Sequence, residues 1–280
     1  MNWNLNRARR LALSACLLLL PYLLPELTLA ADPPPPPQDN PVWQKLRAGL
    51  FQTRPISNNG NDIIELSAPE RAEDAAVVPV SIKTRIAQTP EHYIKAISII
   101  LDNNPAPVAA VFHMTPDTGR ADIETRVRVE QYTHLRAIVE MNDGALSMST
   151  LYLKASGGCS TPASRETSGG ATNLGKMKLT IEENPKLNQP VMAQLMIRHP
   201  NLSGLTMDQV TRLYEPPHYV RRIDVQYAGK PVMTADVDFS ISENPNFRFY
   251  FTPKANGELT AQVEDSDQLT FKTSLNVKAQ

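Results

Sequence analysis

The sequence predicts an all-β protein made of two immunoglobulin-like antiparallel β-sandwich domains, the first with a short N-terminal helix. Apolar and polar residues alternate in many short segments, and Gly, Pro, Asn and Asp residues separate these segments. The full chain has 280 residues. Without an N-terminal export segment about 250 would remain, which suits two domains of about 100–130 residues better than one.

The N-terminus is typical of an export signal. Three arginines precede an apolar run over residues 11–24, and small residues follow at 28–31. The run contains proline and is short for a membrane span. We therefore expect residues 1–30 to be a cleaved signal peptide, which gives a periplasmic protein with no membrane segment. The sequence leaves open whether export is by the Sec or the twin-arginine route.

A spacer and a helix are expected next. Residues 31–40 include five consecutive prolines, which favour a stiff polyproline segment. Val42, Leu46 and Leu50 then recur every four residues beside Trp43. This spacing predicts a short helix that packs on the first domain.

The first domain is expected over residues 41–155. Beyond a turn at 58–61 the apolar period changes from that of a helix to that of a strand. The charged residues of 123–130 alternate with apolar ones, so we expect them to form a solvated face. Asp143-Gly144 predicts a hairpin turn. The expected strands lie near 78–83, 93–101, 108–112, 123–130, 135–141 and 146–153.

The second domain is expected over residues 176–280. It contains seven strand-length apolar runs with turn signals between them, as an antiparallel sandwich requires. The runs lie at 177–181, 191–197, 219–227, 233–241, 247–251, 259–263 and 269–275.

Charge and cysteine content exclude several classes of function. The formal net charge is −1, from 28 basic and 29 acidic residues. This balance gives no reason to expect nucleic acid or an anionic membrane as a partner. The chain has two cysteines, and Cys16 lies in the expected signal. Cys159 would then be the only thiol of the mature protein, so no internal disulfide is expected and buried apolar surface must provide the stability.

The segment around Cys159 is the candidate functional site. Residues 156–175 are mostly Ser, Thr, Gly, Ala, Pro and Asn, a composition that favours a solvated and flexible arm and linker. Gly157 and Gly158 would supply the flexibility and leave the thiol exposed for covalent capture of a cargo. An exposed cysteine has a pKa near ~8.5, so only a small fraction would be thiolate at neutral pH. The alternative is an incidental cysteine in a linker.

Several short stretches then carry a resemblance to a known family. In the first half they are Trp43-Gln44-Lys45, residues 68–74, Val78-Pro79-Val80 and Gly157-Gly158-Cys159; in the second they are Arg198-His199-Pro200, Ser203-Gly204, residues 227–232 and residues 241–245. Residues 41–160 resemble SoxY and residues 176–278 resemble SoxZ. The chain thus resembles a fused SoxYZ carrier of thiosulfate-oxidising systems, and more closely the SoxYZ-like carriers associated with quinoprotein dehydrogenases.

This resemblance implies a carrier and not an enzyme. In the family, cargo is bound covalently to the arm cysteine, here Cys159, and carried between the active sites of partner enzymes. The implied partners are periplasmic redox enzymes, either of Sox type or a quinoprotein dehydrogenase, and no cofactor is implied. The chain departs from the SoxY pattern because Ser160 follows the cysteine and the chain continues.

Two alternatives stay open. In the first, the protein is a non-catalytic adaptor that docks a periplasmic quinoprotein dehydrogenase, and the thiol is incidental. In the second, Cys159 is a catalytic thiol that works with a histidine. Against a metal site, His92, His134 and His218 show no ligand spacing with one another or with Cys159. His199, before Pro200, is expected to shape a strand end.

Overall fold

The computed structural model describes residues 36–162, 173–208 and 210–280. The expected signal peptide and residues 31–35 of the expected proline spacer lie outside these residues. Among the described residues there is no helix with the length and apolar character needed to cross a membrane.

The described part of the first half contains a short helix and strands close to those expected. Two additional short strands, β1 and β2, and the one-turn helix α2 were not predicted. The elements are η1 (Pro37–Asp39), α1 (Pro41–Phe51), β1 (Ile56–Ser57), α2 (Gly60–Ile63), β2 (Ile64–Ser67), β3 (Val78–Thr84), β4 (Ile94–Leu101), β5 (Val108–Met114), η2 (Pro116–Thr118), β6 (Ile123–Val127), β7 (Thr133–Met141) and β8 (Leu146–Leu153).

The second half contains a strand at each of the seven expected runs. The largest difference is in β12, which begins and ends three to four residues before the expected run because its pairing starts at the turn with β11. The strands are β9 (Met177–Ile181), β10 (Val191–Ile197), β11 (Val220–Tyr227), β12 (Lys230–Val237), β13 (Asn246–Phe251), β14 (Gly257–Asp265) and β15 (Thr270–Val277).

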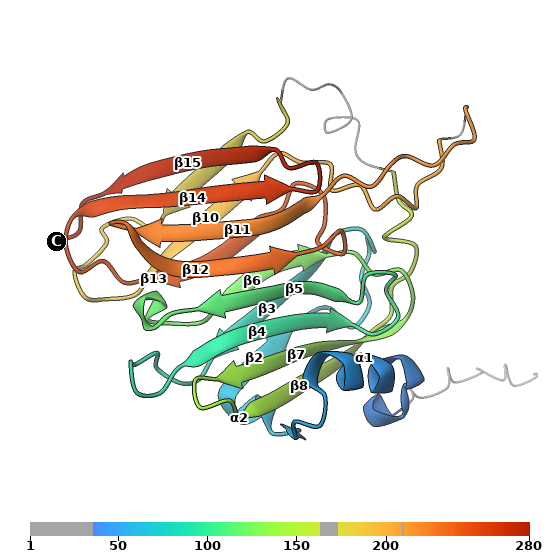
Figure 1. The fold of residues 1–280 in the computed structure, drawn as a ribbon, viewed down its shortest axis with the longest axis horizontal. Helices are drawn as coiled ribbons and strands as arrows, with labels where there is room; N and C mark the ends of the chain where they lie inside the picture. Colours follow the sequence, from blue (N-terminus) through green and yellow to red (C-terminus); the bar gives the residue numbers. More distant parts are fainter. Residues whose placement is uncertain (1–35, 163–172, 209) are drawn as a thin grey trace, which may run out of the picture. The chain divides into compact units, whose positions relative to one another are not determined.

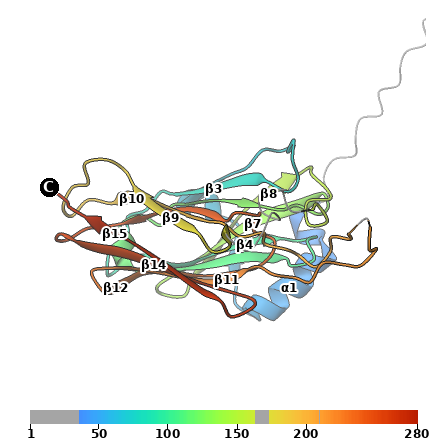
Figure 2. The same ribbon diagram turned by 90° about the horizontal axis from the view of Figure 1, so that it is seen from above.

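These strands form two facing sheets, which confirms the all-β sandwich (Figure 2). One sheet has nine strands in the order β1-β8-β7-β4-β5-β12-β11-β14-β15, and the other has six in the order β2-β3-β6-β13-β10-β9. Inward side chains of both sheets share one core, where the rings of Phe112 on β5 and Phe247 on β13 lie 6.0 Å apart. Alternation of buried and partly buried residues along strands such as β10 follows from this arrangement.

Both sheets continue from the first half of the chain into the second. In the nine-stranded sheet β12 pairs antiparallel with β5, so that Ala235 lies opposite Phe112. Figure 1 shows these two strands side by side, β5 in green and β12 in orange. In the six-stranded sheet β13 pairs with β6 at Arg248 and Glu124. The expected segments 41–155 and 176–280 are therefore joined through both sheets.

Helix α1 forms where the sequence predicts it, but the face it buries differs from the expected one. Asn40 caps it by accepting a hydrogen bond from the Val42 amide at 3.0 Å. Trp43 is buried, whereas Val42 and Leu50 are exposed. The reason is Arg136 on β7, whose guanidinium lies 4.2 Å from the centre of the Trp43 ring and draws that side of the helix onto the sheet.

Candidate functional site

The chain turns sharply after β8, in a segment of residues 157–160 that we call the Cys159 turn. Its backbone pairs with the segment that follows β6: the Gly157 amide donates to the Glu130 carbonyl at 2.9 Å, and the Gly158 amide donates to the Val129 carbonyl at 3.0 Å. The described part of the expected arm is thus packed against the first half of the protein. The remaining linker residues, 163–172, lie outside the described residues.

The two glycines lie in a packed turn, where each has a different structural role, whereas the sequence predicted that both would make the segment flexible. A β-carbon on Gly158 would lie 2.0 Å from the Ala75 carbonyl oxygen, so only glycine allows this approach. Gly157 has φ +84°, in the left-handed region, with no atom within 4 Å of a hypothetical β-carbon. Gly158 therefore permits the close contact with Ala75, and Gly157 permits the left-handed backbone of the turn.

The Glu130 carboxylate holds the Cys159 turn. It accepts hydrogen bonds from the Cys159 amide at 2.8 Å, the Ser160 amide at 3.3 Å and the Ser160 hydroxyl at 2.7 Å. Three donors on one carboxylate form a cap for a short turn, and bonds to an ionised acceptor are the stronger kind. The second half contributes as well, because the Ser203 hydroxyl donates to the Cys159 carbonyl at 2.6 Å.

Cys159 is buried, with 0 % of its surface exposed, so the expectation of an exposed thiol is wrong for this conformation. Burial, together with the negative charge of Glu130, raises the pKa of the thiol to about 12, against smaller opposing effects of Arg128 and Ser240. The thiol is therefore neutral at physiological pH. The composition of the segment predicted exposure, but contacts with distant residues cover it.

Arg128 is the charged residue beside this thiol. It is 2 % exposed, although the alternation of residues 123–130 predicted a solvated position. Its amide donates to the Ser240 carbonyl at 2.8 Å, and its Nη2 donates to the Pro200 carbonyl at 3.2 Å. These contacts with the second half hold the side chain inside. The buried thiol thus has neighbours from both halves, Arg128 from the first and Ser240 from the second.

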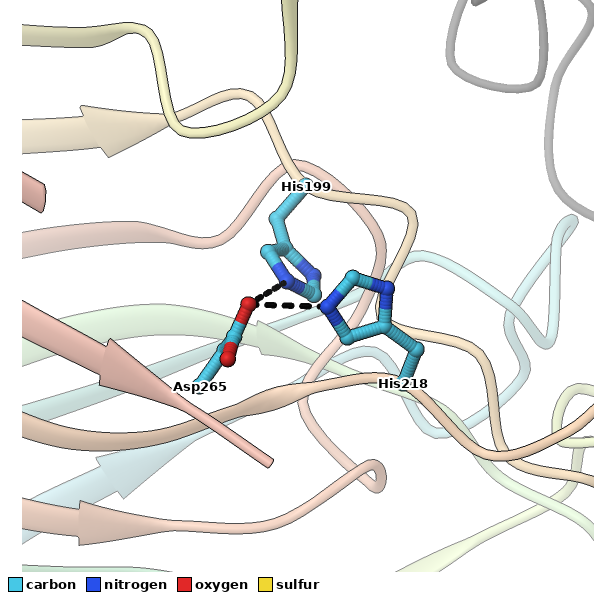
Figure 3. Close-up of side chains that lie close together, drawn as sticks. All are labelled: His199, His218 and Asp265. Atoms are coloured by element: carbon cyan, nitrogen blue, oxygen red, sulfur yellow. Dashed lines mark hydrogen bonds and ion pairs between the residues drawn. The ribbon is translucent and has the colours of Figure 1, made fainter. Parts of the chain in front are cut away.

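A second polar cluster lies in the second half, where His199, His218 and Asp265 meet (Figure 3). One Asp265 carboxylate oxygen lies 2.8 Å from His218 Nε2 and 3.5 Å from His199 Nε2. The sequence did not predict this meeting, because the three residues come from separate segments. His92 and His113 are exposed and lie outside the cluster.

These three side chains are of types that bind metals, but the hydrogen bonding of His199 opposes a metal here. The Asn201 amide donates to His199 Nδ1 at 3.1 Å. In a neutral imidazole whose Nδ1 is an acceptor, the proton must be on Nε2, the atom that faces Asp265. A metal-binding histidine instead donates its other ring nitrogen to an acceptor. The geometry therefore favours two imidazole N–H groups directed at one carboxylate oxygen.

Residues 199–203 connect this cluster to Cys159. His199 lies at the cluster, the Pro200 carbonyl accepts from Arg128, and the Ser203 hydroxyl holds the Cys159 carbonyl. Asn201 fixes the middle of the segment, since its side chain accepts from the Val220 amide at 2.9 Å and donates to the Ile241 carbonyl at 2.9 Å. The expected role of His199 at a strand end is therefore part of a larger support for the thiol.

Comparisons with known proteins match the two halves separately. The family described as "Sulfur oxidation protein SoxY" matches residues 47–159, and that described as "Sulphur oxidation protein SoxZ" matches residues 177–276. No curated protein matches the chain.

Among solved structures, the sulfur carrier protein SoxY from Chlorobium limicola f thiosulfatophilum is 27% identical, with 40% of this chain and 90% of that chain covered and a TM-score of 0.34. A superoxide reductase (neelaredoxin) from Ignicoccus hospitalis is 17% identical, with 39% of this chain and 82% of that chain covered and a TM-score of 0.28. The two family matches lie in tandem, and the first ends at Cys159. The chain belongs to the SoxYZ-like sulfur-oxidation carriers, as a SoxY domain and a SoxZ domain fused in one polypeptide.

Proposed function

We propose that the protein is a periplasmic carrier that binds a small sulfur-containing cargo covalently through Cys159 and presents it to Sox-type redox enzymes. In this proposal residues 1–30 direct export and are removed. The SoxY domain extends over 41–155, and the SoxZ domain extends over 176–280. The carrier itself catalyses no reaction.

The observation that carries the proposal is the position of Cys159. It is the last residue of the SoxY match, and it lies where groups of both domains meet. The Cys159 turn is held by a small set of hydrogen bonds, chiefly those of Glu130. Such a set can break and re-form, and the space beside Gly157 gives the turn room to move. We infer that the structure is a retracted state and that a second state presents the thiol.

The retracted state protects the thiol. A cysteine with a pKa of about 12 has almost no thiolate at neutral pH, and thiolate is the form that reacts. Loading then requires the presented state. When the thiol forms an S–S bond with a sulfur cargo, it loses its proton and the pair of reactants loses two electrons. The partner redox enzyme must accept those electrons, because nothing in this chain is proposed to do so.

The same pKa weakens the alternative of a thiol enzyme. A catalytic cysteine needs a nearby base or a lowered pKa, and burial here has the opposite effect.

The other alternative, an adaptor that docks a quinoprotein dehydrogenase, differs from the carrier because an adaptor does not need the thiol. The replacement Cys159→Ser would leave an adaptor functional and would abolish a carrier.

The decisive experiment is the intact mass of the protein purified from its native periplasm without reductant. We expect a fraction with an added mass that a thiol reductant removes and that Cys159→Ser lacks. The Cys159→Ser protein should fold normally, because serine fits the same position, and its circular dichroism and melting temperature provide the control. A native pool that contains only bare thiol or only disulfide-linked dimer would contradict the proposal.

A further inference from the structure

A neutral imidazole at His199 holds the backbone of the segment 199–203. The Asn201 amide donates to His199 Nδ1 at 3.1 Å, and both residues are fully buried. The other ring nitrogen, Nε2, lies 3.5 Å from a carboxylate oxygen of Asp265. A ring nitrogen accepts a hydrogen bond only while it carries no proton. The bond from the Asn201 amide therefore exists only while His199 is neutral.

The segment 199–203 also holds the Cys159 turn from the side of the second half. The Ser203 hydroxyl donates to the Cys159 carbonyl at 2.6 Å, and the Pro200 carbonyl accepts from Arg128 at 3.2 Å. Each contact is a single hydrogen bond, and such a bond weakens steeply when its length or angle departs from the optimum. A displacement of this backbone would therefore release the turn from the second half.

A proton on His199 would displace this backbone. The new Nδ1–H would face the Asn201 N–H across 3.1 Å, so that two donors would oppose each other. The charged and titratable groups that act on the ring are His218, in the segment before β11, Asp265, at the end of β14, and Asp267, in the turn that follows. Burial, together with His218, lowers the pKa of His199 to about 4, against the opposing effects of Asp265 and Asp267. The ring is therefore neutral at pH 7 while the turn is retracted.

We propose that His199 is a positioning residue for Cys159, whose neutral ring keeps the Cys159 turn retracted and whose protonation releases it. This inference rests on the proposed carrier function, because it gives the change from the retracted to the presented state a trigger. Once the segment has moved, the ring is less buried and its pKa returns toward the ordinary value of 6.5. The presented state then binds a proton that the retracted state does not. A fall in pH from 6.5 toward 4 therefore favours presentation of the thiol.

The reactivity of the thiol with dithiodipyridine tests this role. The cysteine sulfur bonds to one sulfur of the reagent, the S–S bond of the reagent breaks, and thiopyridone leaves with the proton of the thiol, so the reagent is the oxidant. The full chain carries Cys16→Ser, which makes Cys159 its only thiol. The measured quantity, which we call exposure, is the rate in native protein divided by the rate in urea-unfolded protein at the same pH. We expect exposure to rise about tenfold between pH 7 and pH 5.

His199→Asn is the most informative variant. The side-chain oxygen of asparagine accepts from an amide two residues further along, as His199 Nδ1 does here, but it takes no proton. Exposure at pH 7 should stay as low as in the wild-type protein, and its rise at pH 5 should disappear. His92→Asn, at an exposed position, should keep the full rise. Ser203→Ala should raise exposure at pH 7 severalfold, because the bond to the Cys159 carbonyl is lost.

Unfolding of the whole protein would also expose the thiol at low pH, so each rate is measured at several urea concentrations below the unfolding transition. A local release uncovers little surface and should leave exposure nearly constant, whereas unfolding would make it increase steeply with urea. A steep increase would overturn the proposal, and so would equal exposure of the wild-type protein at pH 7 and pH 5. Neither comparison requires a variant to fold. A rise that remains in folded His199→Asn protein would overturn it as well.

These measurements use protein without cargo. The native-mass experiment decides whether Cys159 carries a cargo, whereas the exposure ratio decides what holds the turn. The carrier proposal and the role of His199 can therefore fail separately.

Discussion

The Glu130 carboxylate holds the Cys159 amide at 2.8 Å, across 29 positions of sequence. This contact links the segment that follows β6 to the turn that follows β8. It places a negative charge near a thiol whose pKa is already raised by burial. One side chain therefore both fixes the turn and suppresses thiolate formation, so it should set the reactivity of the thiol.

The first prediction follows from this dual role. Glu130→Gln should increase the rate of Cys159 alkylation by iodoacetamide at pH 8 by about tenfold or more, because a bond to a charged group contributes about 1.5–3 kcal/mol. Removal of the charge also lowers the thiol pKa, which acts in the same direction. The matched control is Glu124→Gln, which removes an exposed carboxylate bonded to Arg248. An unchanged alkylation rate in Glu130→Gln would show that other contacts hold the turn.

The second prediction concerns the glycines. Gly158→Ala should destabilise the fold, because the new methyl group would lie 2.0 Å from the Ala75 carbonyl oxygen. Gly157→Ala should cost less, about 1 kcal/mol, since it meets open space and has only the strain of φ +84°. Gly49→Ala in α1 should be neutral or stabilising by about 0.5–1 kcal/mol. Urea unfolding gives the order, and a Gly158→Ala protein as stable as wild type would contradict it.

The third prediction concerns the buried ion pair between Arg136 and Asp102, next to helix α1. Arg136 and Asp102 are both fully buried, and Arg136 donates from Nε and Nη2 to the two Asp102 oxygens at 2.7 and 2.6 Å. Asp102→Asn leaves the guanidinium charge without its counterion and should cost about 3–5 kcal/mol. The fluorescence of Trp43, which stacks on Arg136, should change with it.

The control for this change is an exposed ion pair. Loss of the pair between Arg248 and Glu124 should cost less than about 1 kcal/mol, because solvent screens it. If Asp102→Asn and Glu124→Gln have similar free energies of unfolding, the buried pair does not stabilise the helix as we argue.

The strands could be predicted from sequence because their signal is local. The alternation in β10 and the Asp143-Gly144 turn between β7 and β8 each lie within a few residues. The continuity of the sheets could not be predicted in the same way. The pairing of β5 with β12 joins residues more than 100 positions apart, and no local pattern specifies it.

The environment of Cys159 could not be predicted for the same reason, because it depends on residues that are distant in sequence. The sequence predicted Cys159 as the functional thiol, and the small polar residues around it predicted that it would be exposed. Its burial depends on Glu130 and Ser203, which are distant in sequence and of ordinary type. Arg128 was assigned to a solvated face because it continues the alternation of β6, yet the strand ends at Val127 and the next residue turns inward. A period-2 pattern predicts which side chains are exposed only within a strand, and Arg128 lies beyond the end of β6.

The last prediction is a pH dependence of stability that comes from His199. Burial, together with the neighbouring His218, lowers the pKa of His199 from an ordinary value of 6.5 to about 4, against the opposing effect of Asp265. Between these two values the unfolded chain binds a proton that the folded protein does not. Stability must therefore fall as pH decreases from 6.5 toward 4.

The full effect is about 3 kcal/mol, at about 1.4 kcal/mol for each pKa unit. Asp265, whose carboxyl pKa is lowered chiefly by its bond to His218 against the effect of burial, adds a loss only below its ordinary value of 3.8. His199→Gln should flatten the dependence of the unfolding free energy on pH between 6.5 and 4, whatever its effect at pH 7. His92→Gln, at an exposed position, should preserve the wild-type slope. Parallel slopes for wild type and His199→Gln would show that His199 does not stay neutral in the folded protein, and the argument for its Nε2 proton would fail with it.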